Sequence, residues 1–338
     1  MRAKRYPAFW GGDNAIARAL SPIGWIFGQI AAQRRRRYAT HPHWRQRIDA
    51  PVLVVGNLSV GGTGKTPLVI WLVECAQQLG FNPGVVLRGY GGHATGPVWV
   101  SPHDSAAKVG DEAVLIAQQT GVGVAIGRDR PAAAHLLTAA GVDLVISDDG
   151  LQHYRLERDA EIVVVDGQRG LGNGRCLPAG PLREPAERLT HADVVICNGA
   201  QRSDCQGRFD LVPGALRPVG SMQARVHSVS PPQPGDCVHA LAGIGNPNRF
   251  FLTLRDLGFV ITEHPLPDHH RFSAADLHFP DQQAVVMTAK DAVKCADIAS
   301  NNCWQLPVLA QPDQPTANQL TDLINRAAQR FAQRESLS

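Results

Sequence analysis

One segment near residue 60 restricts the fold of this chain more than any other. An apolar run over residues 52–55 leads into a loop with glycines at 61, 62 and 64, and Lys65 and Thr66 follow at the start of a helical stretch. Glycines let consecutive backbone N–H groups turn toward one anion, and a helix that begins at the lysine directs its positive end there. The segment therefore predicts the strand, loop and helix of a P-loop, which binds nucleoside triphosphates.

The strict P-loop pattern has one exception here, because Ser59 occupies the position of its first glycine. The doubled glycine before Thr63 compensates and is typical of one branch of P-loop proteins. We expect the Lys65 ammonium to reach the β- and γ-phosphates and the Thr66 hydroxyl to bind Mg²⁺. The expected nucleotide-binding residues of the loop are Gly61, Gly62, Thr63, Gly64, Lys65 and Thr66.

A second apolar run, over residues 144–147, ends in Asp148 and Asp149. A carboxylate at the end of a strand beside the P-loop holds Mg²⁺ in such proteins. Taken alone, an aspartate followed by glycine is equally consistent with a simple turn. Together with the P-loop, the pair predicts a magnesium-nucleotide site.

Short apolar runs alternate with helical stretches from residue 51 to 199, which predicts an α/β fold. We expect a P-loop NTPase-type, mostly parallel sheet, flanked by helices and buried on both faces. The predicted P-loop domain covers residues 51–210. A proline-rich connector over 211–236, with extended strands near 224–229, leads to a second, smaller α/β domain over 237–338 that closes over the site.

Loops at the carboxyl ends of the predicted parallel strands should meet around one crevice. Two of them carry arginines that could bind phosphate, Arg128 and Arg130, and the residues leave the choice open. Asp111 precedes a helix, where simple N-capping is the alternative to a functional role. Adjacent histidines at 269 and 270 form no complete metal site, because a third ligand at metal spacing is missing.

Residues 1–50 form a separate basic arm. They hold ten basic and two acidic residues, a net charge of +8, so the other 288 residues carry a net charge of −5. The rest of the chain therefore lacks the basic stripe that a nucleic-acid-binding protein needs.

The same arm contains a predicted helix. Ser21 and Pro22 predict its start, and Ile23, Ile26, Phe27 and Ile30 then share one face ahead of four arginines at 34–37. Fifteen uncharged residues over 19–33 are too few to span a bilayer. Residues 19–37 therefore predict an amphipathic helix on an anionic leaflet, or alternatively a helix packed on the body.

The seven cysteines are scattered and mostly lie in apolar runs. This pattern argues against a disulfide framework or a zinc site and favours a reducing compartment. The arginine block follows the apolar stretch instead of preceding it, so we do not expect a secretory signal.

Several segments in order resemble the tetraacyldisaccharide 4'-kinase family, the lipid A 4'-kinases of Gram-negative bacteria. They are the P-loop region over 54–67, Arg-Gly-Tyr-Gly-Gly at 88–92, Gly-Asp-Glu at 110–112, Asp-Asp-Gly-Leu-Gln-His at 148–153, Gly-Pro-Leu-Arg-Glu at 180–184, Asp-His-His at 268–270 and Thr-Ala-Lys-Asp at 288–291. The resemblance implies transfer of the γ-phosphoryl group of ATP to the 4'-hydroxyl of a tetraacylated glucosamine disaccharide 1-phosphate. The acceptor is a membrane lipid, which implies a peripheral protein on the cytoplasmic face of the inner membrane, and we expect a monomer.

The resemblance also implies roles for individual residues. Asp111 is the base, paired with His269, or with His270 as the alternative. Lys65 and Arg183 neutralise the transferring charge. The implied Mg²⁺ residues are Thr66, Asp148, Asp149 and Glu184, and the nucleotide side adds Gln152 and Arg128, with Arg130 as its alternative. Ala289 departs from the acidic residue expected between Thr288 and Lys290.

Two other classes of protein are weighed against this assignment. A membrane-associated P-loop ATPase switch would hydrolyse ATP without a lipid acceptor. A membrane scaffold that only binds ATP would have no reason to gather Asp111, Asp148, Asp149, Glu184 and Lys65, because buried like charges are costly.

Overall fold

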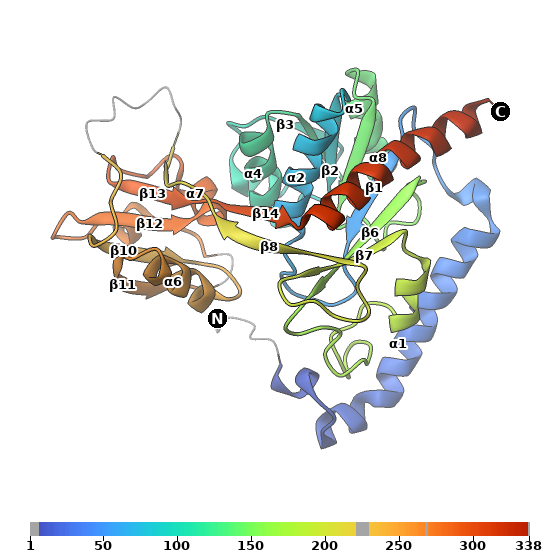
Figure 1. The fold of residues 1–338 in the computed structure, drawn as a ribbon, viewed down its shortest axis with the longest axis horizontal. Helices are drawn as coiled ribbons and strands as arrows, with labels where there is room; N and C mark the ends of the chain where they lie inside the picture. Colours follow the sequence, from blue (N-terminus) through green and yellow to red (C-terminus); the bar gives the residue numbers. More distant parts are fainter. Residues whose placement is uncertain (1–6, 221–229, 268–269, 337–338) are drawn as a thin grey trace.

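The computed structural model describes residues 7–220, 230–267 and 270–336, which form two lobes (Figure 1). The larger lobe holds a nine-stranded sheet in the order β14-β8-β7-β6-β1-β5-β2-β4-β3. Its strands are β1 (Val52–Gly56), β2 (Pro83–Leu87), β3 (Val98–Val100), β4 (Gly123–Ile126), β5 (Leu144–Asp148), β6 (Ala160–Asp166), β7 (Val194–Asn198), β8 (Gly207–Pro213) and β14 (Val308–Pro312). Only the pairings of β3 with β4 and of β14 with β8 are antiparallel in this sheet, so the predicted mostly parallel α/β fold is confirmed.

The smaller lobe holds a five-stranded sheet in the order β11-β10-β12-β13-β9. Its strands are β9 (Arg217–Pro218), β10 (Cys237–Ala242), β11 (Val260–Pro265), β12 (Ala284–Thr288) and β13 (Cys303–Leu306). The described α-helices are α1 (Ala15–Thr40), α2 (Lys65–Gln78), α3 (Ala106–Val109), α4 (Asp111–Thr120), α5 (Arg130–Ala139), α6 (Pro247–Asp256), α7 (Ala289–Cys295) and α8 (Gln314–Glu335). Short 3-10 turns lie at Ala8–Gly11, Pro42–Trp44, Ala186–His191 and Ala274–Leu277.

The central strand β1 is buried on both faces, as a strand with the sequence Val-Leu-Val-Val-Gly should be in a parallel sheet. Leu53 and Val55 pack in one cluster with residues of α2 and α4, and Val54 packs on the opposite face with Ala133 and Leu137 of α5. This double cover fixes β1 and β5 side by side, in the register Val55 to Asp148. The carboxyl ends of both strands therefore open at the same edge of the sheet.

The end of the chain differs from the expected domain division. Residues 237–338 were expected in the smaller domain, but β14 pairs with β8 and α8 buries Leu320 and Ile324 in the core cluster of the larger lobe. The physical reason is that β8 would otherwise be an open edge strand and that the apolar stripe of α8 needs a core to cover it. In contrast, β9 of the expected connector joins the smaller sheet. The strands expected near 224–229 lie outside the described residues.

Helix α1 begins earlier than the Ser21-Pro22 pair predicted. Asn14 caps it by accepting a hydrogen bond from the Ala17 N–H at 3.0 Å, and Pro22 lies inside the helix. The proline has no N–H to donate within the helix. Ser21 turns its hydroxyl back to the Ala17 carbonyl at 2.8 Å, and the helix continues. A stronger cap upstream therefore overrides the proline signal.

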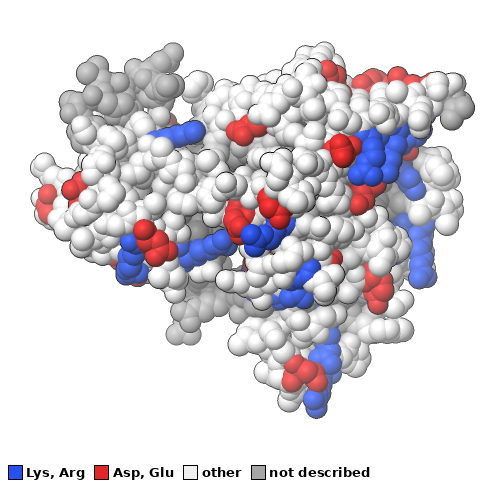
Figure 2. Space-filling model, viewed as in Figure 1, with Lys and Arg blue, Asp and Glu red and all other residues white. Residues whose placement is uncertain are grey.

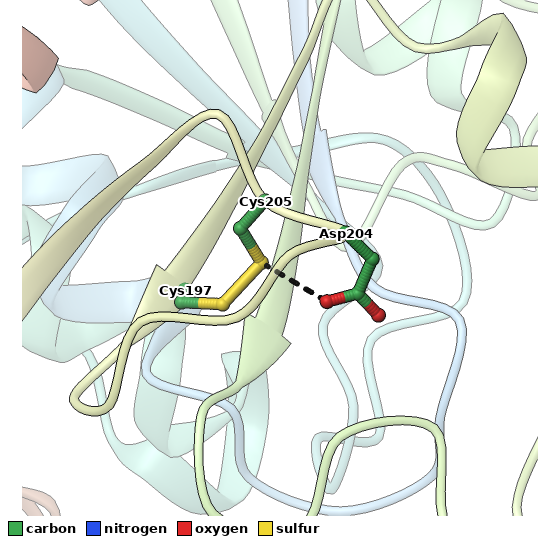
Figure 3. A group of neighbouring side chains, drawn as sticks. All are labelled: Cys197, Asp204 and Cys205. Carbon is green, nitrogen blue, oxygen red and sulfur yellow. Dashed lines mark hydrogen bonds between the residues drawn. A yellow bond between two sulfur atoms is a disulfide. The ribbon is translucent and has the colours of Figure 1, made fainter.

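One cysteine pair also differs from expectation. Cys197 at the end of β7 and Cys205 before β8 form a disulfide, with Asp204 beside it (Figure 3). The loop between the two strands returns to β7, and so brings these residues together. These three residues are the only group in the described part of the chain with metal-ligand spacing, but joined sulfurs offer no thiolate. Of the other cysteines, four are buried and Cys237 is exposed.

Candidate active site

The P-loop forms at the carboxyl end of β1. Gly64 caps α2 with a φ of +86°, and Gly61 has a φ of +109°, two left-handed conformations that favour glycine. A Cβ atom at Gly64 would lie 2.5 Å from the Asn198 Nδ2 atom, so the close approach of β7 also requires glycine there. Asn198 donates a hydrogen bond to the Thr63 carbonyl at 3.1 Å, which ties the loop to the end of β7.

Lys65 is held at the base of this loop by two acceptors. Its Nζ atom donates to Asn57 Oδ1 at 2.9 Å and lies 3.4 Å from Asp149 Oδ1. Asn57 is fully buried and donates to the Ser59 carbonyl at 2.5 Å. One asparagine thus shapes the loop and holds its lysine. The sequence signal for this role is a polar residue placed just after an apolar strand.

Asp148 and Asp149 occupy different environments at the end of β5. Burial, together with the negative charge of nearby Glu112, raises the pKa of Asp148 to about 7. Within the described part of the chain, no donor reaches Asp148 Oδ1. The backbone of Asp149 has a φ of +49°, a left-handed conformation. Burial would raise the pKa of Asp149, but Lys65 and Arg183 outweigh it and lower that pKa to about 2.

Arg183 forms an ion pair with Asp149 and belongs to a loop that runs beside the P-loop. Its Nη1 atom lies 3.1 Å from both Asp149 oxygens. The Arg183 N–H donates to the Leu58 carbonyl at 2.7 Å, so the two loops are fastened together. The structure thus brings Lys65, Asp148, Asp149 and Arg183 to one edge of the sheet.

The two arginines that the sequence left open have different surroundings. Arg130 is buried, and its Nη2 atom donates to the Asp148 carbonyl at 3.1 Å beneath β5. Burial lowers the pKa of Arg130 to about 10. Arg128 is exposed in the loop after β4. Arg130 therefore supports the strand end, and Arg128 lies on the surface of the protein.

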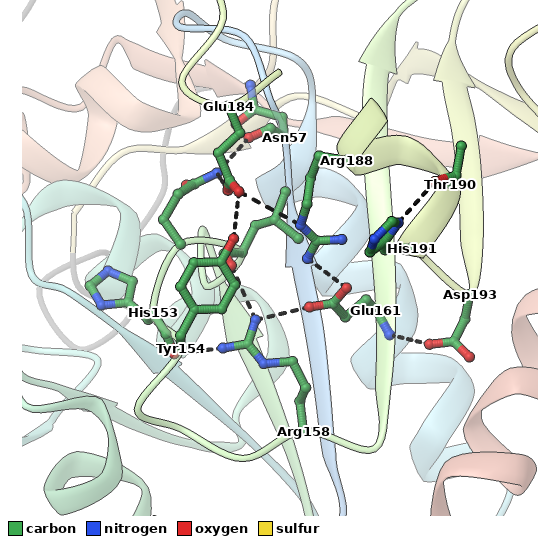
Figure 4. Close-up of polar contacts among 12 residues, drawn as sticks. Asn57, His153, Tyr154, Arg158, Glu161, Glu184, Arg188, Thr190, His191 and Asp193 are labelled. Carbon is green, nitrogen blue, oxygen red and sulfur yellow. Dashed lines mark hydrogen bonds and ion pairs between the residues drawn. The ribbon is translucent and has the colours of Figure 1, made fainter. Parts of the chain in front are cut away.

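Glu184 belongs to a buried polar network under the P-loop (Figure 4). Its Oε2 atom accepts from the Tyr154 hydroxyl at 2.5 Å, and its Oε1 atom accepts from Gln152 Nε2 at 3.1 Å. Gln152 also lies 3.4 Å from the Asn57 carbonyl. Protein donors thus occupy both oxygens of a residue that the resemblance places at Mg²⁺, and Gln152 links Glu184 to the P-loop.

Three further ion pairs, made by two arginines, complete this network. Arg188 lies 3.8 Å from Glu184 and 2.6 Å from Glu161, and Arg158 lies 3.0 Å from the other Glu161 oxygen. The Arg158 guanidinium also donates to the His153 carbonyl at 2.6 Å. Burial and the positive charges of Arg130 and Arg88 lower the pKa of His153 to about 4, so its ring is neutral at pH 7.

Asp111 is the first residue of α4, which Gly110 caps, so the N-cap alternative does not apply. The Asp111 side chain is buried, and its Oδ1 atom accepts from the Glu112 N–H at 2.9 Å. Lysines of the smaller lobe face this turn: Lys294 Nζ lies 3.8 Å from Asp111 Oδ2, and Lys290 binds Glu112. Sequence patterns did not indicate these pairs, because their partners are more than 170 residues apart.

The two adjacent histidines, His269 and His270, were the expected partners of Asp111. His269, the residue expected to pair with Asp111, lies outside the described residues. The alternative, His270, has its Nε2 atom 3.5 Å from Asp276 Oδ2, so its acidic neighbour is Asp276. Asp276 lies in the short 3-10 turn capped by Ser273, only six residues after His270, so the two side chains pair locally.

Comparisons with known proteins give one consistent family. A family model described as tetraacyldisaccharide-1-P 4'-kinase matches residues 16–326. A tetraacyldisaccharide 4'-kinase of Alkalilimnicola ehrlichii is 51% identical over 95% of this chain and 97% of its own length, and one of Halorhodospira halophila is 47% identical over the same shares. The crystal structure of LpxK from Aquifex aeolicus in complex with ATP superposes with a TM-score of 0.77 at 26% identity, covering 93% of this chain and 99% of that one.

Proposed function

This chain belongs to the tetraacyldisaccharide-1-phosphate 4'-kinase family, and we propose from that premise how its own residues perform the reaction. The protein is an ATP-dependent kinase of lipid A biosynthesis that phosphorylates the 4'-hydroxyl of a tetraacylated disaccharide 1-phosphate. One observation supports the assignment of its site most directly. Lys65 and Arg183 both contact Asp149 where the P-loop meets the end of β5.

The P-loop and two cations hold the phosphates of ATP in this proposal. Backbone N–H groups over residues 61–66 point at phosphate oxygens, and the N-terminal end of α2 adds its dipole. The transition state of phosphoryl transfer is loose, so positioning and charge neutralisation matter most. Lys65 and Arg183, held ready by Asn57 and Asp149, supply that positive charge to the transferring group.

The donor set at the end of β5 fits Mg²⁺. Asp148 Oδ1 is buried without a protein donor in the described part of the chain, and hard oxygen ligands are those that Mg²⁺ prefers. We assign Thr66, Asp148 and Asp149 to the ion. When bound, Mg²⁺ neutralises charge on the β- and γ-phosphate oxygens. Glu184, also implied by the resemblance, acts one step away by fixing Gln152 and Asn57.

Asp111 accepts the proton of the acceptor hydroxyl in this proposal. Its position at the start of α4 places a carboxylate where the two lobes meet, next to Lys294 of the smaller lobe. A base within hydrogen-bond reach of the hydroxyl speeds transfer by about 10²- to 10⁴-fold. His269 pairs with this carboxylate and carries the proton away.

Membrane contact through α1 is part of the proposal. The helix packs on the body through its small residues: a Cβ atom at Gly24 would lie 2.7 Å from the Cys176 carbonyl, and one at Gly28 would lie 3.0 Å from Cys176 Sγ. Its large apolar side chains point outward, with Ile23 55% and Ile30 61% exposed. An ordinary surface helix has the reverse arrangement. The outward stripe therefore suits the acyl boundary of a bilayer.

The arginines at 34–37 continue α1, and Figure 2 shows basic side chains along this side of the larger lobe. Each basic residue near an anionic leaflet adds about 1 kcal/mol of attraction. None of the helices in the described ranges has the length and hydropathy to cross a membrane. We therefore propose a peripheral protein on the cytoplasmic face of the inner membrane, with its lipid acceptor in that leaflet.

A transfer assay tests the assignment. Wild-type protein in detergent with Mg²⁺ and [γ-³²P]ATP should label a tetraacylated disaccharide 1-phosphate. Lys65→Met should lower transfer by at least about 100-fold. Asp111→Asn should lower it about 10²- to 10⁴-fold while ATP still binds, because the base alone is lost.

The matched control is Lys108→Gln, which removes a lysine from a surface ion pair with Asp104 and should leave transfer unchanged. Label released only as inorganic phosphate, at a rate indifferent to the lipid, would replace the kinase with an ATPase switch.

A further inference from the structure

Helix α7 joins the two lobes. It follows β12 of the smaller sheet, and its Ala292 and Cys295 side chains pack in the core of that lobe. Its Ala289 and Val293 side chains pack instead in the core cluster of the larger lobe, which includes residues of α4 (Figure 1). Because both cores hold one short helix, side chains on α7 have fixed positions relative to α4.

Two lysines of α7 face the first turn of α4. Lys290 binds Glu112, and Lys294, one helical turn later, lies 3.8 Å from Asp111 Oδ2. Burial would lower the pKa of Lys290, but Glu112, Asp111 and Asp148 raise it above its usual value, so this lysine is charged. The smaller lobe thus brings two cations to a region crowded with carboxylates.

The Lys294 ammonium is itself held by Asp291, one helical turn earlier in α7. Its Nζ atom lies 2.9 Å from Asp291 Oδ1, and Asp291 is fully buried. The other Asp291 oxygen accepts from the Thr288 hydroxyl at 2.7 Å and from the Gly243 N–H at 2.9 Å. The Phe272 ring covers the ammonium with its centroid 5.7 Å away. Asp291 and Phe272 thus hold the Lys294 ammonium in place against Asp111.

We propose that Lys294 is a positioning residue for the reaction: anchored by Asp291, it holds the Asp111 carboxylate in the orientation that accepts the proton of the acceptor hydroxyl. The inference rests on the proposed role of Asp111. It explains why an anchored ammonium of the smaller lobe lies against the first turn of α4. The orientation of the Asp111 carboxylate then depends on contact between the lobes, because Asp291 and Thr288 belong to the smaller lobe.

A double-mutant cycle tests the inference in the full-length protein. The variants are Lys294→Gln, Asp111→Asn, both together and Lys294→Arg. Glutamine keeps an N–H donor for the buried Asp291, which favours folding, but it lacks the charge. Lys294→Gln should lower kcat about 10- to 100-fold without changing the Kd for ATP, because misplacing a reacting group by about 1 Å has effects of that size. Lys294→Arg should restore most of kcat.

The coupling between the two sites decides the result. In the Asp111→Asn background, Lys294→Gln should change the remaining transfer rate by less than about 2-fold, since groups that act as a unit are not additive. Lys108→Gln provides the matched control. An inactive Asp111→Asn protein in which Lys294→Gln still costs its full factor would overturn this inference alone. A fully active Asp111→Asn protein would overturn the role of Asp111 and this inference with it.

Discussion

Tyr154 is the neutral donor in a buried network that otherwise consists of charges and one amide. Burial and the neighbouring Glu184 carboxylate raise the pKa of Tyr154 above its usual value, so the phenol keeps its proton and donates a hydrogen bond to Glu184. Glu184 in turn orients Gln152, which reaches the backbone of Asn57, the residue that holds Lys65. Three successive contacts therefore connect this hydroxyl to the P-loop and let it contribute to the shape of the loop.

Removing that hydroxyl should destabilise the protein. Tyr154→Phe leaves one oxygen of a buried carboxylate without its donor, which costs about 1–3 kcal/mol. Urea unfolding measures the change in the free energy of unfolding. Lys108→Gln is the control, because it removes only a surface ion pair with Asp104 and should change that free energy little. Equal free energies for wild type and Tyr154→Phe would show that Arg188 and Gln152 suffice for Glu184.

The residues of the site differ in how far the sequence could predict them. Lys65 follows the glycine-rich loop, and Asp148 and Asp149 lie directly after a predicted strand, so local pattern was sufficient to place them. Arg183 and Glu184 came only from the resemblance. Lys290 and Lys294 could not be predicted, because their pairing with α4 depends on how two cores share α7. A pattern within one segment carries no information about such a contact.

Among the helices, α1 places its small residues against the body and its large apolar side chains on the surface. Small residues let it approach the loop around Cys176, and that loop continues into Arg183 and Glu184 of the site. At its other end, Tyr38 lies against Tyr154, with ring centroids 6.0 Å apart. A helix docked in a leaflet would therefore hold the active site close to the membrane surface, where a lipid acceptor resides.

Charges placed on the outward stripe should weaken membrane binding. Burying one isoleucine side chain contributes roughly 1.5–3 kcal/mol, so Ile23→Glu with Ile30→Glu should lower partitioning onto anionic vesicles by about 100-fold or more. Cosedimentation with phosphatidylglycerol-containing vesicles measures it. The control is Leu252→Glu with Val260→Glu, a pair of similar exposure in the smaller lobe. Unchanged partitioning of the α1 variant, or an equal loss in the control, would contradict docking through α1.

The elements also show where sequence patterns stop being informative. Alternating apolar runs predicted β1, β2, β4, β5, β6 and β7, because parallel strands buried on both faces stand out. The edge strands β3 and β14 are half exposed and lack that signal. The start of α1 was misplaced because a proline inside a helix resembles a proline at its first turn.

At the scale of the whole molecule, the chain crosses between the lobes twice, after β8 and again before β14. The return places α8 on the larger sheet and leaves the smaller lobe as an insertion between β8 and β14. The sequence could not predict this insertion, because β14 and β8 are separated by the entire smaller sheet. The insertion brings α7, with its two lysines, to the carboxyl edge of the larger sheet (Figure 1).

The central claim is that this assembly transfers phosphate to one particular hydroxyl. The most direct test is to incubate the purified protein with ATP, Mg²⁺ and a purified tetraacylated disaccharide 1-phosphate, and to locate the new phosphate by phosphorus–proton correlation in the NMR spectrum of the product. The account predicts a bis-phosphate whose new phosphorus couples to the proton on carbon 4'. A new phosphate on another carbon, or an unchanged acceptor with ATP hydrolysed to ADP and inorganic phosphate, would contradict it.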